Sequence, residues 1–271
     1  MRDFIHLKVV CTDKIAFAQL ARPEKANALN DVLWFELEQL AIWADATPEV
    51  RVLVLSGEGK HFCAGIDFSL AGALFSSISH LPEGQKQEAL CGRIKELQRA
   101  FSALEHCRKP VIAAVHGSCI GGGIDLITAC DMRYASENTR FSVKEVDLGI
   151  VADIGTLQRL PHLIGEGMVR ELAYTGREFD ALEACSMGLI NRVFEDKEKL
   201  QEGVSALAKS IAEKSPLTIR GIKRTLNFSR DHSVEEGLDY VALWNSSMLL
   251  SQDTQQAISG IMSGSKPQFL D

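Results

Sequence analysis

One stretch of the chain, KPVIAAVHGSCIGGGIDLITACDMRYAS at residues 109–136, predicts much of the fold. Residues 111–115 form a continuous apolar run just after Pro110, which is typical of a buried strand. Gly121, Gly122 and Gly123 then open a helical segment, and residues 131–136 return to a strand pattern. A strand, a glycine-rich turn, a helix and another strand in succession predict a layered α/β core.

The same alternation of strands and helices continues on both sides of this stretch. Residues 4–10 and 15–21 predict a β-hairpin, and residues 50–57 predict a buried strand. Asn30 is expected to cap a helix that begins near Asp31. Residues 93–106 predict a further helix, whereas residues 71–90 have weak periodicity and indicate a mobile loop or short helices. From Asp153 onward the pattern is helical, apart from a short strand NRVF.

The domain organisation follows from this pattern. Strands and helices alternate through the first two thirds of the chain, and the last part is helical throughout. We therefore expect an α/β core at residues 1–195 and a helical C-terminal region at residues 196–271. That helical region, which contains Trp244 and Met248, either covers its own core or docks on a second subunit.

Composition excludes several classes of protein. The net charge of −7 argues against a nucleic-acid partner and against an anionic membrane surface. We find no apolar run long enough to span a membrane and no targeting segment. The 7 cysteines are scattered without a C-x-x-C pair, which fits neither a disulfide framework nor a zinc site. These features predict a reducing, cytoplasmic setting and no metal.

Two glycine-containing turns are candidates for binding an anion. The first is Ala64–Gly65–Ile66–Asp67, and the second is the triple glycine at residues 121–123. The first N–H groups of a helix lack partners within the helix, so such a turn suits a phosphate or a developing oxyanion. The spacing fits neither a dinucleotide-binding fingerprint nor a Walker A loop. A tight turn with close helix–strand packing would need the same glycines, so the turns alone leave both interpretations open.

Three carboxylates strengthen the functional interpretation. Asp125, Glu145 and Asp153 all lie in glycine-rich or apolar segments without an obvious basic partner. Asp125 alone would be an ordinary acid at a helix N-terminus. Carboxylates gathered in an apolar pocket instead have raised and split pKa values, which proton transfer requires. We interpret His116 as structural, and Asp147 as a structural acid that caps a turn.

Read together, these motifs resemble the enoyl-CoA hydratase/isomerase (crotonase) superfamily over nearly the whole chain. The resemblance rests on the 109–136 stretch and on RPEKANALN, GKHFCAGIDFS, FSVKEVDLGIVADIGTLQRLPHLIG and ALEACSMGLINRVF. It implies a core that is a spiral of ββα repeats, with a helical C-terminal trimerisation region. An Asp after the triple glycine, a Glu in KEVD and an Asp in ADIG resemble the delta(3,5)-delta(2,4)-dienoyl-CoA isomerase subgroup. A hydratase usually has Glu at the position of Asp125 and Gly at that of Asp153.

The resemblance implies a reaction: isomerisation of a 3,5-dienoyl-CoA to a 2,4-dienoyl-CoA, in the beta-oxidation of unsaturated fatty acids. A proton would move from C2 to C6 through a dienolate. Glu145 would be the base at C2 and Asp153 the distal acid, although the reverse assignment stays open. Asp125 would orient or tune the pair. The two oxyanion-binding N–H groups would be those of Ala64 and Gly122.

The remaining implications concern binding and assembly. No metal or redox cofactor is implied, because coenzyme A is part of the substrate, and the assembly would be a homotrimer or homohexamer. The alternatives are an enoyl-CoA hydratase or a delta(3)-delta(2)-enoyl-CoA isomerase with the same oxyanion hole. A non-catalytic, RNA-binding member is disfavoured by the acidic balance. The acyl and pantetheine path would be lined by Ala64, Gly65, Ile66, Asp67, Phe68 and Gly122, with Arg22 and Lys25 as candidates for the CoA phosphates.

Overall fold

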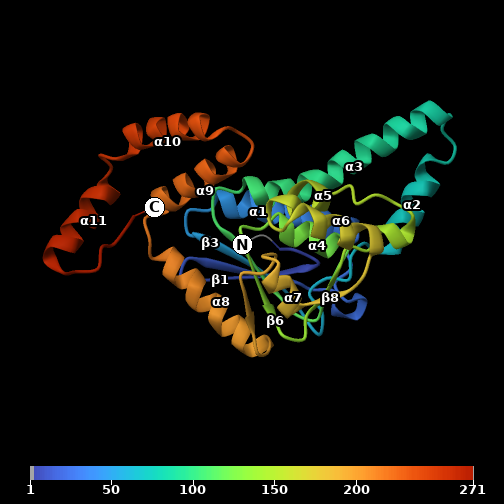
Figure 1. Ribbon diagram of the computed structural model, residues 1–271, viewed down its shortest axis with the longest axis horizontal. Coiled ribbons are helices and arrows are strands. Elements are labelled where there is room, and N and C mark those ends of the chain that lie inside the picture. Colours follow the sequence, from blue (N-terminus) through green and yellow to red (C-terminus); the bar gives the residue numbers. More distant parts are fainter. Residues whose placement is uncertain (1–2, 271) are drawn as a thin grey trace.

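The molecule is an α/β core from which two helical segments project, as Figure 1 shows. The computed structural model describes residues 3–270, apart from the side chains of residues 71 and 73–75. One projection is formed by α2 (Phe68–Ile78) and the first half of α3 (Glu83–His106). The other is formed by α10 (Val234–Met248) and α11 (Gln252–Ser263).

The larger sheet has six strands in the order β1-β2-β3-β4-β6-β9. The first two strands pair antiparallel, and every later pair is parallel. Asp13 and Lys14 both have positive φ angles, of 50° and 65°, as the tight turn of the predicted hairpin requires. The strands are β1 (Leu7–Thr12), β2 (Ile15–Leu20), β3 (Val52–Gly57), β4 (Val111–Val115), β6 (Met132–Ser136) and β9 (Arg192–Phe194).

A smaller, three-stranded sheet lies beside the larger one and shows that the chain winds as a spiral. Its strands are β5 (Ser118–Ile120), β7 (Arg140–Ser142) and β8 (Phe179–Asp180), in that order. Cys63, downstream of β3, bridges to Cys119 in β5. After β3, β4 and β6 the chain thus contributes a short extended segment to the second layer before it returns through a helix. This repetition confirms the crotonase-like spiral predicted from the sequence.

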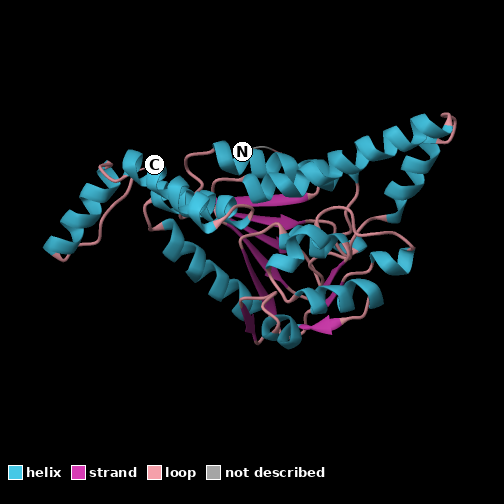
Figure 2. Cartoon of the chain, turned by 45° about the horizontal axis from the view of Figure 1, so that its top comes forward, coloured by secondary structure: helices cyan, strands magenta, loops and turns pink. Residues whose placement is uncertain are grey.

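Both faces of the larger sheet are covered, as Figure 2 shows. Leu53 and Leu55 of β3 join the main apolar cluster beneath α1 (Asp31–Ala46) and α3, whereas Val52 and Val54 join a second cluster beneath α8 (Lys197–Ala212). Alternate side chains of a strand point to opposite faces, so a strand covered on both faces needs an unbroken apolar run. The packing of α8 places it with the core, and the predicted boundary between residues 195 and 196 stays a prediction.

The helices agree with the sequence except at one place. Asn30 caps α1, its side chain accepting a hydrogen bond from the Leu33 N–H at 2.9 Å. α3 begins at Glu83, well before the predicted start at Arg93, because its exposed first half has good helix-forming residues but no apolar stripe. The remaining helices are η1 (Pro23–Lys25), α4 (Gly122–Thr128), η2 (Glu145–Leu148), α5 (Thr156–Arg159), η3 (Leu160–His162), α6 (Glu166–Thr175), α7 (Ala181–Ser186) and α9 (Pro216–Arg230).

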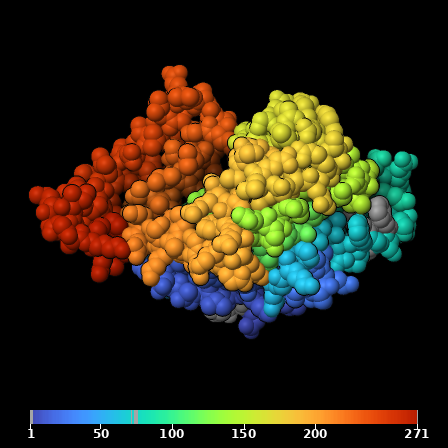
Figure 3. All heavy atoms as spheres, turned by 60° about the horizontal axis from the view of Figure 1, so that its bottom comes forward, coloured from blue at the N-terminus to red at the C-terminus, as the bar shows by residue number. Residues whose placement is uncertain are grey.

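Of the C-terminal helices, α9 packs on the core, whereas α10 and α11 project from it. Lys223 of α9 is buried and donates to Asp131 at 2.7 Å, so α9 is anchored to the core. α10 and α11 form a lobe set apart from the rest by a notch, as Figure 3 shows. Within residues 3–270, no helix has both the length and the apolarity needed to cross a membrane. The lobe carries large apolar side chains that are more than half exposed to solvent: Val234, Leu238, Leu243, Leu249, Leu250, Ile258, Ile261 and Met262.

Candidate active site

The two glycine turns meet at one pocket. A Cβ atom added at Gly65 would lie 2.9 Å from the Ile120 carbonyl oxygen, and one at Gly122 would lie 3.8 Å from Gly65. The turns are therefore in direct contact although they lie far apart in the sequence. A pocket lies between them. It is lined by both turns and the three predicted carboxylates, and by Trp34, Phe68, Ile120, Lys144, Leu148, Ile150 and Ile154.

Hydrogen bonding decides which N–H groups are available to an oxyanion. The Ala64 N–H donates to the Ala26 carbonyl at 3.0 Å, so the structure corrects the prediction that Ala64 is a free donor. The Gly65 carbonyl accepts from the Leu29 N–H at 2.8 Å. In a trans peptide the N–H points opposite to its C=O, so the Ile66 N–H points away from Leu29. Among residues 3–270, the N–H groups of Ile66 and Gly122 donate to no other group.

The triple glycine is required because other atoms of the chain approach it too closely for a Cβ atom. Gly121 has a φ of +51°, and a Cβ there would lie 3.1 Å from a Glu145 carboxylate oxygen. A Cβ at Gly123 would lie 2.9 Å from the Cys63 carbonyl oxygen. Gly122 is the first residue of α4, where the N–H has no partner within the helix. The run of glycines thus brings an open N–H and a carboxylate to the same pocket.

Asp125 lies in the first turn of α4 and is almost completely buried. Its Oδ1 atom accepts two hydrogen bonds from Thr156, one from the backbone N–H at 2.6 Å and one from the hydroxyl at 2.7 Å. Burial raises the pKa of Asp125 to about 6, while the Thr156 hydrogen bonds oppose that rise. A buried carboxylate with these partners can be ionised at neutral pH.

Glu145 begins η2 and is half-buried. Its Oε2 atom is buried without a hydrogen-bond partner in the described chain. Burial, and next the negative charge of Asp125, raise the pKa of Glu145 to about 7. A polar atom left unsatisfied in this way is costly, and such atoms mark places where a ligand completes the structure.

Asp153 lies in the loop before α5 and is exposed at the pocket. Its carboxyl group is only partly shielded from solvent, and this partial burial raises its pKa. The loop is fixed from α3, because Gln98 donates to the Asp153 carbonyl at 2.6 Å. Arg159 donates to the Ile154 carbonyl at 3.3 Å and pairs with Glu105 at 2.9 Å. The three carboxylates predicted from the sequence therefore line one pocket.

The other predicted residues have more ordinary surroundings. Asp67 caps α2 and pairs with Arg22 at 3.0 Å, and hydrogen bonds from Ser69 hold its pKa at about 2. Arg22 is buried, and its guanidinium also donates to the Ala28 carbonyl. Lys25 is exposed. The prediction that Arg22 and Lys25 meet the CoA phosphates stays a prediction, with Arg22 already engaged by the loop itself.

His116 lies in the structural setting expected of it, whereas Asp147, expected to cap a turn, is exposed and caps none among the described residues. His116 is buried, its Nε2 lies 3.1 Å from the Gly59 carbonyl oxygen, and burial lowers its pKa to about 4. Asp147 forms an ion pair with Lys144 at 2.7 Å. Thr156, which sequence reasoning missed, has no motif of its own. The only sequence signal for it is a hydroxyl side chain directly after Gly155, at the start of a helical pattern.

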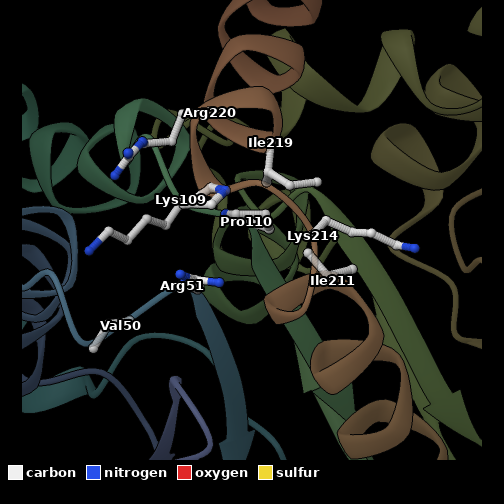
Figure 4. Close-up of a pocket in the computed structure, with 9 residues that line it drawn as sticks. Val50, Arg51, Lys109, Pro110, Ile211, Lys214, Ile219 and Arg220 are labelled. Atoms are coloured by element: carbon white, nitrogen blue, oxygen red, sulfur yellow. The ribbon is translucent and has the colours of Figure 1, made fainter. Parts of the chain in front are cut away.

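A second cleft does not suit proton transfer. It lies where β3 and β4 begin, next to the connection between α8 and α9, and is too narrow for a substrate (Figure 4). Its lining residues include Arg51, Lys109, Lys214 and Arg220 but no acid among the nine described. Arg51 donates to the carbonyls of Ala212 and Phe269, at 2.9 and 2.7 Å. This basic cleft therefore ties the C-terminal segment to the core. Nowhere in residues 3–270 are three or more His, Cys, Asp or Glu side chains arranged to hold a metal ion.

Comparison with known proteins gives relatives that span most of the chain. A peroxisomal delta(3,5)-delta(2,4)-dienoyl-CoA isomerase of Arabidopsis thaliana is 51% identical, covering 92% of this chain and 90% of its own length. A mitochondrial enzyme of the same name from Homo sapiens is 45% identical, covering 93% of this chain and 77% of its own length. The crystal structure of an enoyl-CoA hydratase from Bacillus anthracis superposes with a TM-score of 0.88 at 29% identity, covering 98% and 99% of the two chains.

The prediction of a cytoplasmic setting is wrong on this comparison. The Arabidopsis relative is named peroxisomal, and the human relative is named mitochondrial. The prediction rested partly on scattered, unpaired cysteines. Free thiols argue against an oxidising compartment, but they do not distinguish one reducing compartment from another.

The family itself is settled by the extent of the match. The family model described as enoyl-CoA hydratase/isomerase matches residues 11–271. The relatives' names confirm the sequence prediction of an isomerase of this family and its resemblance to the dienoyl-CoA isomerase subgroup. With the spiral fold and the pocket between two glycine turns, these matches show that the chain belongs to the enoyl-CoA hydratase/isomerase family.

Proposed function

We propose that the chain converts a 3,5-dienoyl-CoA to a 2,4-dienoyl-CoA, in the beta-oxidation of unsaturated fatty acids. The observation that carries the proposal is the set of three carboxylates, Asp125, Glu145 and Asp153, around one pocket with two open backbone N–H groups. All three have raised pKa values. The names of the relatives support the same reaction.

Proton removal comes first in the proposed mechanism. Ionised Glu145 takes a proton from C2, and the electrons of the C2–H bond form a dienolate whose charge lies on the thioester oxygen. The N–H groups of Ile66 and Gly122 hold that oxygen, where the charge develops. We place Ile66 in the role first predicted for Ala64, because the Ala64 N–H already donates to Ala26.

Proton delivery completes the isomerisation. The dienolate is conjugated as far as C6, and Asp153 in its protonated form donates a proton there. The C–H bond formed at C6 replaces the one broken at C2, and the double bonds move into conjugation with the carbonyl. A proton must then return from Glu145 to Asp153, through solvent or bound water. The pKa of about 7 for Glu145 suits a group that both accepts and releases a proton near neutral pH.

Substrate binding uses the rim of the same pocket. Phe68, Leu148 and Ile150 are exposed apolar side chains there, and an acyl chain would cover them. Lys25 is exposed in the loop before α1 and is the better candidate for a CoA phosphate, with Arg22 holding the loop. The residues of the pocket supply the acid, the base and the oxyanion donors, so the mechanism calls on no redox group or metal.

We also propose a homotrimer, alone or paired into a homohexamer. The support is the apolar surface of the α10–α11 lobe and a groove between α9, α10 and α11, lined in part by Trp244 and Met248. An apolar surface of this kind favours association. Light scattering tests the proposal: Leu250→Lys should lower the mass of the assembly, whereas Leu182→Lys, an exposed leucine on α7, should not.

The test of the activity uses two substrates. The chain is supplied with a 3,5-dienoyl-CoA and, separately, with a 2-enoyl-CoA, while ultraviolet absorbance reports the conjugated diene and the loss of the enoyl group. We expect diene formation from the first and little hydration of the second. Fast hydration of the 2-enoyl-CoA without diene formation would instead assign the chain to the hydratases.

A further inference from the structure

The carboxyl group of Asp125 is held from one side by one residue. Both donors of Thr156, the backbone N–H and the hydroxyl, converge on the same oxygen, at 2.6 and 2.7 Å. Thr156 is completely buried, and Asp125 is 1% exposed. Solvent therefore cannot replace a hydrogen bond that Thr156 loses.

The charged groups around Asp125 make its hydrogen bonds from Thr156 important for its ionisation. Glu145 of η2 and Asp153 lie close enough for mutual repulsion, and Arg159 of α5 partly offsets that repulsion. The buried thiols of Cys63 and Cys119 also lie nearby, but their raised pKa values keep them neutral. Two donors on one oxygen are thus the main contacts that stabilise the ionised form of Asp125 in a dry, acidic environment.

Thr156 also fixes the position of a second carboxylate. It begins α5, three residues after Asp153, at the end of a loop that Gln98 and Arg159 also hold. The bonds from Thr156 to Asp125 hold the inner side of the same loop. One residue therefore connects the Asp125 carboxylate on α4 to the segment that carries Asp153.

We infer that Thr156 is a positioning residue: its N–H and hydroxyl keep Asp125 in place as a carboxylate beside Glu145, and they fix the Asp153 loop against α4. This inference rests on the proposed function for its catalytic meaning. The contact it describes can also be measured without turnover.

The experiment compares three variants of the full chain. Thr156→Val removes the hydroxyl at nearly constant volume, and Thr156→Ser restores it. Thr128→Val is the matched control, because the buried Thr128 hydroxyl donates to the backbone carbonyl of Asp125, at 2.9 Å, and not to its carboxylate. Each is assayed with a 3,5-dienoyl-CoA for kcat and KM across pH.

We expect Thr156→Val to lower kcat about ten- to a hundredfold, with KM changed by less than about twofold, since a hydrogen bond to a charged group is lost. The carboxylates titrate as a set, and the doubly ionised pair becomes harder to form. The acid limb of kcat/KM should therefore move about one pH unit upward. Thr156→Ser should recover most of both effects, and Thr128→Val should show neither.

A second measurement keeps the inference separate from the proposed reaction. Carbon-13 NMR of carboxyl-labelled protein follows the titration of the Asp125–Glu145 pair, identified with Asp125→Asn and Glu145→Gln. Thr156→Val should raise the titration midpoint even if no diene is formed. If the native chain makes no diene, the proposed function fails while this readout still tests Thr156. An unchanged midpoint and pH profile in folded Thr156→Val would overturn the inference.

Discussion

Glu145 should destabilise the protein at the pH where it works, and replacing it should show this directly. Its pKa rises from the ordinary 4.5 to about 7, chiefly through burial and then through Asp125. Its Oε2 atom has no hydrogen-bond partner in the described chain. The perturbation is Glu145→Gln, which keeps the shape of the side chain and removes the charge.

The magnitude follows from the linkage between ionisation and folding. A pKa difference of one corresponds to about 1.36 kcal/mol, so full ionisation of Glu145 costs the folded state about 3 kcal/mol. The unfolded chain ionises near pH 4.5 and the folded chain only near 7, so this cost grows between those values and is complete above pH 7. Glu145→Gln should therefore stabilise the protein by up to about 3 kcal/mol at pH 8, and hardly at all near pH 4.5.

Thermal unfolding measures this effect. For a chain of 271 residues, 3 kcal/mol corresponds to a rise in Tm of about 5 °C. Asp147→Asn is the matched control: Asp147 lies on the same turn but is exposed and paired with Lys144, so its loss should not stabilise the protein. Turnover of a 3,5-dienoyl-CoA should meanwhile fall by orders of magnitude in Glu145→Gln. An equal or lower Tm than native at pH 8 would refute the reasoning.

Three further predictions address the other parts of the site. Asp153→Asn should stop diene formation from a 3,5-dienoyl-CoA yet retain exchange of its C2 protons with D₂O, measured by mass spectrometry. Loss of that exchange, with exchange at C6 retained when a 2,4-dienoyl-CoA is supplied, would reverse the roles of Asp153 and Glu145. Ile66→Pro removes one oxyanion donor and should lower kcat about 10²- to 10³-fold in folded protein, checked by circular dichroism, and an unchanged kcat would exclude that N–H. Lys25→Ala should raise KM severalfold with kcat unchanged in steady-state assays, since a solvated phosphate contact binds ground and transition states alike; equal KM values would remove Lys25 from the CoA site.

The sequence was sufficient where a property is set locally. The hairpin of β1 and β2, the cap at Asn30 and the buried strand at 111–115 follow from a few neighbouring residues each. The three carboxylates were also predictable, because charged groups in apolar, glycine-rich segments stand out against the rest of the chain. The first half of α3 was missed for the opposite reason, since an exposed helix has no apolar stripe to reveal it.

The sequence was insufficient where a role depends on a partner far along the chain. Ala64 and Ile66 lie in the same turn, and no pattern tells which N–H is open. The difference comes from Ala26, whose carbonyl accepts from Ala64, and from Leu29, whose N–H orients the next peptide. Thr156 is a similar case, because its importance comes only from contact with Asp125, 31 residues earlier.

The spiral explains how one chain can bring groups from distant parts of its sequence to one pocket. Ile66 follows β3, Gly122 follows β5, and Glu145 follows β7, so successive turns of the spiral each deliver one group to the same pocket. Packing of the covered strands behind these turns stabilises the fold and offsets the unfavourable free energy of burying carboxylates without a basic partner. Asp153 departs from this arrangement, since it lies on a loop that Gln98, Arg159 and Thr156 help to hold in place. Its exposure in the free chain fits the proposed role of distal acid, because an acyl chain bound in the pocket would complete the wall around it.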